Sequence, residues 1–126
     1  MSSIGWNWPN LDGLYYYFTV TKIPALLPPA SGVYNICRIV PDGFVPLYVG
    51  ETENLHKRLV LEMSKHEGFS RSLDHGATHI GYHLAEEEDR LRIETELRHS
   101  LSPPCNLQPV PFGGIAALLA GRQPPK

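Results

Sequence analysis

The sequence lacks an excess of charge of one sign, a long hydrophobic run and an internal repeat. Its 11 lysines and arginines against 13 acidic residues leave a formal net charge of −2. Contact with nucleic acid would therefore need a local basic patch or a partner protein. The most apolar stretch, residues 23–30, is short and interrupted by prolines, and no basic stretch precedes an apolar run at the N-terminus. We therefore expect a cytoplasmic protein with no membrane partner.

Cysteine is also scarce, which excludes a disulfide-rich scaffold. The two cysteines, Cys37 and Cys105, form neither a metal-ligand spacing nor a disulfide framework, and we expect both to be reduced. A chain of 126 residues with 42% hydrophobic residues is long enough to form one compact domain. The mixture of strand and helix patterns described below predicts an α/β or α+β fold.

A β-hairpin is the clearest local structure that the sequence predicts. The runs GVYNICRIV and FVPLYVG, residues 32–40 and 44–50, are rich in β-branched and aromatic residues, as strands are. Between them, Pro41 fixes its own φ and Gly43 permits the positive φ of a tight turn. If the turn comprises the three residues 41–43, Tyr34 lies opposite Gly50 and Tyr48 is its diagonal neighbour on the same face.

Two helices and a third strand are predicted after the hairpin. Asn54 can cap a helix that runs from residue 55 to about residue 66. Residues 78–84 alternate in polarity and predict a strand, and a second helix runs from residue 85 or 86 to residue 100, before Pro103. The apolar residues of the first helix share one face: Leu55, Leu59 and Met63.

These elements divide the chain into three parts. Residues 1–30 form an aromatic and proline-rich extension that packs on the domain and contains one strand, GLYYYFTV. Residues 31–108 contain the hairpin, the third strand and both helices. Residues 109–126 comprise a proline-rich loop, a short apolar segment and a polar tail.

The two hairpin tyrosines have two possible roles. Their hydroxyls can meet over one small patch of the sheet, and Gly50 leaves room there for the close approach of a ligand. Tyrosines in strands also commonly pack hydrophobic cores. The hairpin alone does not decide between these roles.

One carboxylate and one guanidinium are predicted to lie toward the core. On the second helix, Glu94 falls within the apolar stripe, whereas Glu96 points away. A buried carboxylate needs a cation, a metal ion or hydrogen-bond donors. Arg58, at the edge of the first helix's stripe, can bind a phosphate or form a structural ion pair with Glu94 or Glu62. The other members of the second helix's stripe are Leu91, Ile93, Leu97 and Leu101.

Five short motifs resemble those of the GIY-YIG nuclease family. They are GVY at residues 32–34, YVG at residues 48–50, Arg58 in NLHKRL, Glu94 in RIETEL and Asn106 in PPCN. Five matches in the family's order and spacing are more specific than either tripeptide. The resemblance spans about residues 31–107 and implies the GIY-YIG fold, a small three-stranded antiparallel sheet flanked by helices. It also implies a metal-dependent endonuclease that hydrolyses phosphodiester bonds.

The resemblance implies a role for each matched residue. Glu94 would hold a single Mg²⁺ or Mn²⁺ ion, since one carboxylate suffices for a mostly hydrated ion. Arg58 would bind the scissile phosphate, and Tyr48 would be the general base with support from Tyr34. Free tyrosine has a pKa of about 10, so a nearby cation must lower it. A structural cap is the alternative role of Asn106. The residues expected to bind substrate are Gly50, Lys57, Lys65, Arg71 and Asn106.

Two acidic residues depart from the family's pattern. Glu51 directly follows YVG, where its charge would repel a phosphate. Glu62 stands one helical turn after Arg58, where a histidine is common in the family. His56 and His66 could partly substitute for it, although lone histidines in helices are more often surface or core residues.

The sequence therefore predicts a metal-dependent endonuclease that acts on nucleic acid, on DNA in preference to RNA. Its small size implies little sequence preference, a homodimer, or a protein partner that supplies specificity. The alternative is a GIY-YIG-like module that binds nucleic acid or protein with little or no catalytic activity. The acidic balance and the missing histidine favour this alternative.

Two lysines of the first predicted helix provide a test of nucleic-acid binding. We expect modest affinity that falls steeply with salt, because phosphate contacts release counterions. The changes Lys57→Glu and Lys65→Glu should weaken binding uniformly across sequences, measured by fluorescence anisotropy of labelled duplexes at several salt concentrations. If the affinity changes neither with salt concentration nor with these substitutions, the contact surface lies elsewhere on the protein.

Overall fold

The computed structural model describes residues 3–107, so the loop, apolar segment and tail expected over residues 109–126 lie outside the described part. It is an α+β fold, which confirms the predicted class. Five strands form one antiparallel sheet in the order β1-β2-β5-β3-β4, where the prediction had three. The strands are β1 (Ser3–Pro9), β2 (Tyr15–Lys22), β3 (Gly32–Val40), β4 (Gly43–Thr52) and β5 (His79–Leu84). The helical elements are η1 (Lys57–Leu61), η2 (Met63–Lys65), α1 (Glu67–Asp74) and α2 (Glu87–Leu101).

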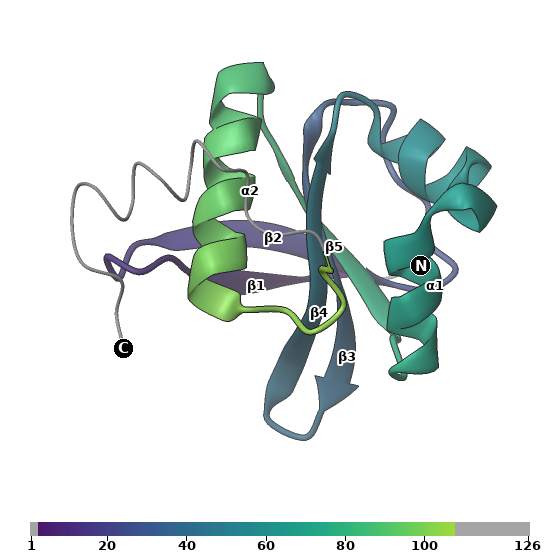
Figure 1. Ribbon diagram of the computed structural model, residues 1–126, viewed down its shortest axis with the longest axis horizontal. Coiled ribbons are helices and arrows are strands. Elements are labelled where there is room, and N and C mark those ends of the chain that lie inside the picture. The colour runs from purple at the N-terminus through teal and green to yellow at the C-terminus, as the bar shows by residue number, and fades with distance from the viewer. Residues whose placement is uncertain (1–2, 108–126) are drawn as a thin grey trace.

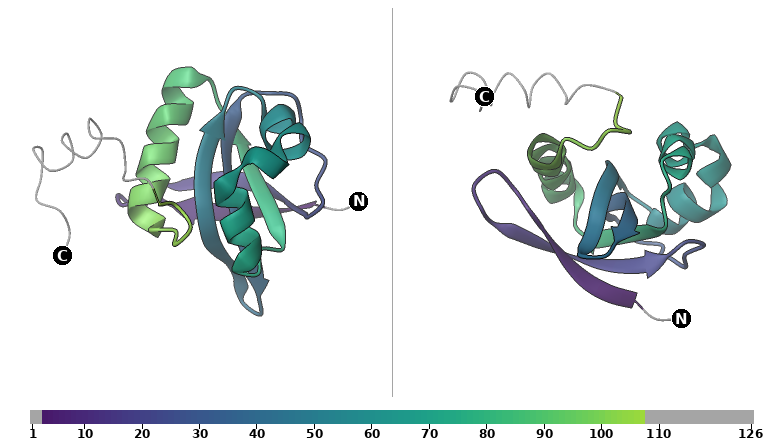
Figure 2. Two further views of the ribbon diagram at one scale, coloured as in Figure 1. Left: turned by 45° about the vertical axis from the view of Figure 1, so that its right-hand side comes forward. Right: turned by 90° about the horizontal axis from the view of Figure 1, so that it is seen from below.

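Helices cover the two faces of the sheet (Figure 1). Helix α2 packs on β1, β3 and β4 from one side, and α1 packs on β3 and β4 from the other. The sheet twists strongly, so that β1 and β2 run crosswise to β3 and β4 in Figure 1 and curl beneath the helices in the right-hand view of Figure 2. This twist is the ordinary right-handed twist of a sheet accumulated over five strands.

The hydrophobic core has one part beneath each helical layer, with β3 between them. Successive β3 side chains point to opposite faces, so one strand contributes to both parts. The part under α2 consists of Trp8, Phe18, Val20, Val33, Cys37, Phe44, Val49, Ile93 and Leu97. The part under η1 and α1 consists of Leu27, Tyr34, Ile36, Leu55, Leu59, Phe69 and Ile80.

The N-terminal residues contribute two strands of the sheet, of which only β2 was predicted. Strand β1 was missed because Gly5 and Pro9 are unfavourable inside strands. Pro9 stands at the last position of β1, and the place of a Gly5 side chain is taken by the Tyr17 ring, whose hydroxyl would lie 2.1 Å from an added Cβ. Both strands contribute buried aromatic residues to the core under α2, so this segment is part of the domain's own packing.

The predicted hairpin is present, with a shorter turn than expected. Val40 pairs with Gly43, so the turn is the two residues between them, and Gly43 has a φ of 146°. The predicted pairing of Tyr34 with Gly50 is confirmed because an irregularity in the ladder after Ile36 adds one residue to β4. The shorter turn and the extra residue in β4 shift the register of the pairing in opposite directions, so the predicted partners are kept.

The first predicted helix is not one regular helix. The Asn54 side chain accepts a hydrogen bond from the backbone N–H of Lys57 (2.9 Å), as expected of a cap. A π turn over η1 and a 3-10 turn over η2 then replace the α-helix, and α1 begins only at residue 67. The wider π turn rotates later side chains off the buried face. As a result, Leu55 and Leu59 are buried as predicted, whereas Met63 is 47% exposed.

Helix α2 begins and ends within a residue or two of the predicted positions. The predicted exposure of two of its side chains, Leu91 and Glu96, was wrong. Leu91 is 46% exposed, so the apolar stripe is narrower than the sequence suggested. Glu96 does not point into solvent: it accepts hydrogen bonds from Asn10 Nδ2 (3.1 Å) and from the hydroxyl of Tyr16. Tyr16 lies on β2 and Asn10 directly follows β1, so the N-terminal segment supplies both partners.

Two aromatic residues of β2 test whether the N-terminal strands belong to the core. Phe18 is fully buried and Tyr15 is 66% exposed. We expect Phe18→Ala to lower the free energy of unfolding by about 3–5 kcal/mol, and Tyr15→Ala to change it by less than about 0.5 kcal/mol. Chemical denaturation of both variants measures this difference. Equal, small effects would mean that β1 and β2 are an accessory extension.

Candidate active site

The two hairpin tyrosines lie together on the sheet face covered by α1. The ring centroids of Tyr34 and Tyr48 are 6.1 Å apart with an interplanar angle of 24°. A Cβ added to Gly50 would lie 2.6 Å from the Tyr34 ring and 3.0 Å from Tyr48. The space over Gly50 is therefore filled by the tyrosines, and it is their packing that requires a glycine there.

The two tyrosines differ in exposure. Tyr34 is 1% exposed and belongs to the core, as in the core-packing role considered for it from the sequence. Tyr48 is only partly buried, which leaves its hydroxyl the more accessible of the two. Burial raises the pKa of Tyr48, the charge of Glu94 raises it further, and the charge of Arg58 lowers it.

His66, one of the two histidines considered from the sequence as a substitute for the family's histidine, contacts this pair. Its Nε2 atom is 2.6 Å from the Tyr34 hydroxyl oxygen, and its Nδ1 atom accepts a hydrogen bond from the backbone N–H of Phe69 (3.1 Å). Burial, with the positive charges of Arg58 and Arg71, lowers the pKa of His66 to about 4. The imidazole is therefore neutral at neutral pH.

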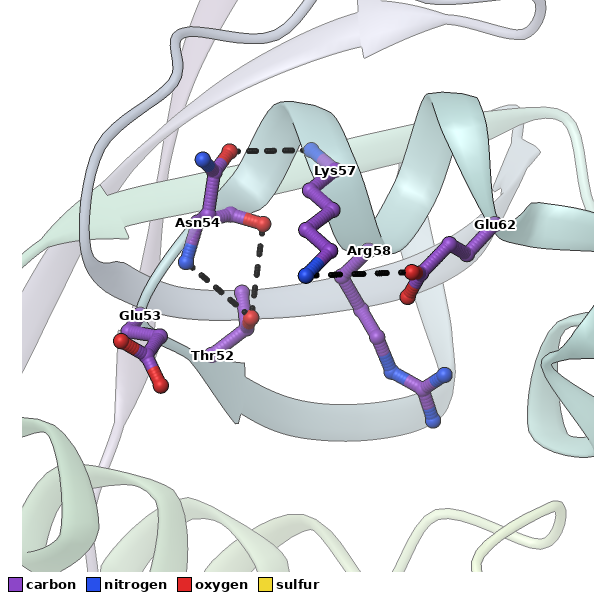
Figure 3. Close-up of a pocket in the computed structure, with 6 residues that line it drawn as sticks. All are labelled: Thr52, Glu53, Asn54, Lys57, Arg58 and Glu62. Carbon is purple, nitrogen blue, oxygen red and sulfur yellow. Dashed lines mark hydrogen bonds and ion pairs between the residues drawn. The ribbon is translucent and has the colours of Figure 1, made fainter.

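Arg58 lies between the tyrosines and an open pocket. The pocket has a volume of about 330 Å³ and lies at the end of β4 and the start of η1 (Figure 3). Burial raises the pKa of Tyr34 as it does that of Tyr48, and the positive charge of Arg58 acts against this rise in both tyrosines. In Figure 3 its side chain extends away from Asn54. The residues lining the pocket are Thr52, Glu53, Asn54, Lys57, Arg58 and Glu62.

Glu94 approaches from the opposite face of the sheet, on α2. Its side chain is 12% exposed, and Arg98 Nη1 lies 3.5 Å from its carboxylate. The pKa of Glu94 is raised to about 7, chiefly by burial; Arg98 acts against the rise, and the charge of Glu51 adds to it. The partner of Glu94 is thus Arg98, one turn along the same helix. The ion pairs considered for Arg58 are not formed, since Glu62 pairs with Lys57 (4.0 Å).

Glu51 is held by an arginine of α2. Arg90 Nε donates a hydrogen bond to the Glu51 carboxylate and lies 2.5 Å from it. The charge of Glu51, which departs from the family's pattern, is therefore neutralised by Arg90. Arg90 and Arg98 were both missed from the sequence, where the only signal was that each stands four residues from Glu94, one on either side.

The remaining predicted substrate residues lie farther from the tyrosines or make structural contacts. Lys65 is exposed at the end of η2. Arg71 Nε donates to the backbone oxygen of Cys105 (3.1 Å). The Asn106 amide makes two hydrogen bonds of 2.8 Å with the backbone N–H and C=O of Val49, which matches the structural alternative for this residue.

Gly68, in the first turn of α1, is a further contact that sequence reasoning missed. A Cβ at this position would lie 2.2 Å from the Tyr48 ring. A glycine in a helix usually costs stability, and that cost was the one available signal of a close approach. The Tyr48 ring is therefore packed against the backbone of α1.

Three properties of the described residues bear on cofactors, cysteines and membranes. Residues 3–107 contain no group of three or more histidine, cysteine or acidic side chains placed to hold a metal ion. Cys37 and Cys105 are both free and buried, as expected. No helix within this range is long and apolar enough to cross a membrane.

Comparison of the chain with protein-family models, with curated proteins and with solved structures gives no match. The resemblance to GIY-YIG nucleases therefore rests on the residues themselves.

His66 makes the stability of the protein depend on pH. Its pKa is about 4 in the folded state and 6.5 in an ordinary environment, so the unfolded state binds the proton more tightly. The resulting stabilisation is complete above a pH of about 6.5 and is lost as the pH falls toward 4. Denaturation between these pH values should show a steeper loss for the wild-type protein than for His66→Asn. An equal loss of stability in the wild-type and His66→Asn proteins over this pH range would contradict this expectation.

Proposed function

We propose that the chain is a metal-dependent endonuclease of the GIY-YIG type that hydrolyses phosphodiester bonds of DNA. One observation carries the proposal: charged side chains from two other elements act on the partly buried tyrosine of β4. Arg58 from η1 and Glu94 from α2 both shift the pKa of Tyr48 on β4. A base, a cation and a carboxylate are the groups that phosphodiester hydrolysis requires.

The order of the inner strands supports the fold that is part of this proposal. Strand β3, which carries GVY, lies between β4, which carries YVG, and β5. These three strands with η1, α1 and α2 correspond to the small sheet flanked by helices that the resemblance implies. Strands β1 and β2 then extend that sheet beyond β5.

Each side chain would have a distinct task in this reaction. Tyr48 would accept a proton from the attacking water, and Arg58 would bind the phosphate while lowering the pKa of Tyr48. Tyr34 is too buried to reach substrate and would support Tyr48 through the packing of their rings. The exposed Lys57 and Lys65 would contact the DNA backbone beyond the scissile phosphate.

Glu94 would hold a single Mg²⁺ or Mn²⁺ ion, which when bound would stabilise charge on the phosphate and on the leaving oxygen. The donor set fits such an ion. The carboxylates of Glu94 and Glu51 are near enough for the charge of Glu51 to raise the pKa of Glu94. One or two carboxylates with several waters is the usual protein site for Mg²⁺. Arg98 would balance the buried carboxylate when no ion is bound.

A module that binds nucleic acid or protein without cleavage is the second candidate. The observation that favours it is the neutralisation of both carboxylates by arginines. Arg98 pairs with Glu94 and Arg90 pairs with Glu51, so the site has no uncompensated negative charge that demands a cation. In either case a homodimer or a protein partner would supply specificity.

Paired substitutions at Glu94 and Tyr48 test the nuclease. Glu94→Gln keeps the side-chain shape but loses the anionic ligand, so it should abolish metal-dependent cleavage. Tyr48→Phe keeps the ring packing but removes the base, so single-turnover cleavage should fall about 10²–10⁴-fold. The exposed Tyr15→Phe on β2 is the matched control and should cleave normally.

Cleavage is measured on supercoiled, branched and single-stranded DNA with Mg²⁺, Mn²⁺ or EDTA, and thermal melting of each variant is measured in the same buffer. Full activity in a cleanly purified Glu94→Gln protein would reject the assignment. Binding without cleavage under every condition would identify the module instead.

A further inference from the structure

The π turn at η1 decides which cation Glu62 contacts. In a regular α-helix, side chains four residues apart are neighbours, so Glu62 would lie beside Arg58. In η1 the backbone N–H of Glu62 instead donates to the carbonyl oxygen of Lys57 (2.9 Å), five residues earlier. The Glu62 carboxylate lies 4.0 Å from the Lys57 amino group, and the two side chains point toward one another in Figure 3. Turns of this kind are rare and occur frequently at functional sites.

The same turn leaves the two cations of the pocket in different states. Lys57, Arg58 and Glu62 all line the pocket at the end of β4. No acidic side chain within residues 3–107 forms an ion pair with Arg58. Lys57, in contrast, is engaged by a carboxylate of the protein itself. An incoming anion therefore meets one cation that has an acidic partner and one that has none in the described part of the chain.

The ion pair between Lys57 and Glu62 is of a kind that an anionic ligand can open. The two side chains are 63% and 37% exposed. Ion pairs of this exposure contribute little to stability, because water screens the charges and both long side chains must be held in place. Lysine binds a phosphate as it binds a carboxylate, through the charge of its ammonium group. A phosphate of the DNA backbone can thus take the place of Glu62 on Lys57.

We propose that Glu62 competes with the DNA backbone for Lys57, so that a phosphate binds there only by displacing the Glu62 carboxylate. This role rests on the proposed function, since it concerns the substrate of the same site. Arg58 binds the scissile phosphate, and the pocket of about 330 Å³ takes a phosphate that flanks it. The glutamate that stands where the family commonly has a histidine thereby lowers the affinity of the site for DNA.

A double-mutant cycle separates this competition from a general effect of charge. The binding of labelled duplex DNA to the full-length protein is measured by fluorescence anisotropy in EDTA, which prevents metal-dependent cleavage. We expect Glu62→Gln to lower the Kd about two- to fivefold. In a Lys57→Met background the same change should alter the Kd less than about 1.5-fold, because the cation for which Glu62 competes is gone.

Glu53→Gln is the matched control. Glu53 lines the same pocket and carries the same charge, but it forms no ion pair within residues 3–107. Because only the screened charge is removed, its Kd should fall less than about 1.5-fold. Thermal melting in the same buffer verifies that each variant is folded.

Three results would overturn the competition: no gain in affinity from Glu62→Gln, an equal gain from Glu53→Gln, or an undiminished gain in the Lys57→Met background. Cleavage by the wild-type protein is tested separately with Mg²⁺ or Mn²⁺. The expected pattern of binding without any cleavage would reject the proposed catalysis and leave the competition for Lys57 standing.

Discussion

Strand β3 is buried on both faces, and the alternation of its side chains decides which groups of the protein can meet. Tyr34 and Ile36 point toward α1, and Val33 and Cys37 point toward α2. Hydrogen bonds to β4 and β5 hold both edges of the strand. A shift of the register by one residue would move Tyr34 to the opposite face, away from its partner His66. The site therefore depends on the pairing of β3 with its two neighbours.

Strand β4 lies at the edge of the sheet and has a helix packed on each face. Tyr48 belongs to the face covered by α1, and Glu94 belongs to α2 on the other face, yet the charge of Glu94 acts on Tyr48. Only at an edge can side chains from the two layers approach each other without a strand between them. Open edges expose unpaired backbone groups, and here Cys105 and Asn106 satisfy those of Leu47 and Val49.

Local patterns predicted the elements whose formation depends on nearby residues. The hairpin, β5 and α2 were found from alternation, turn residues and a 3.6-residue period, each of which acts over short distances. Strand β1 was missed because tertiary contacts compensate for Gly5, and the π turn at η1 was missed because the apolar spacing through Met63 predicted a regular helix. The burial of Glu94 was predicted from its helix position, whereas its partner Arg98 was not.

The sequence by itself determined the residue types of the candidate site and their order: two tyrosines on paired strands, an arginine, and a carboxylate on the buried side of a helix. Spacing along strands and helices was sufficient for this, because it decides which face a side chain occupies. Only the tertiary structure decided which charges pair and which way the hydrogen bonds run. His66 is distant from Tyr34 in the sequence, and its tautomer depends on the amide of Phe69, an interaction that exists only once α1 has packed on the sheet.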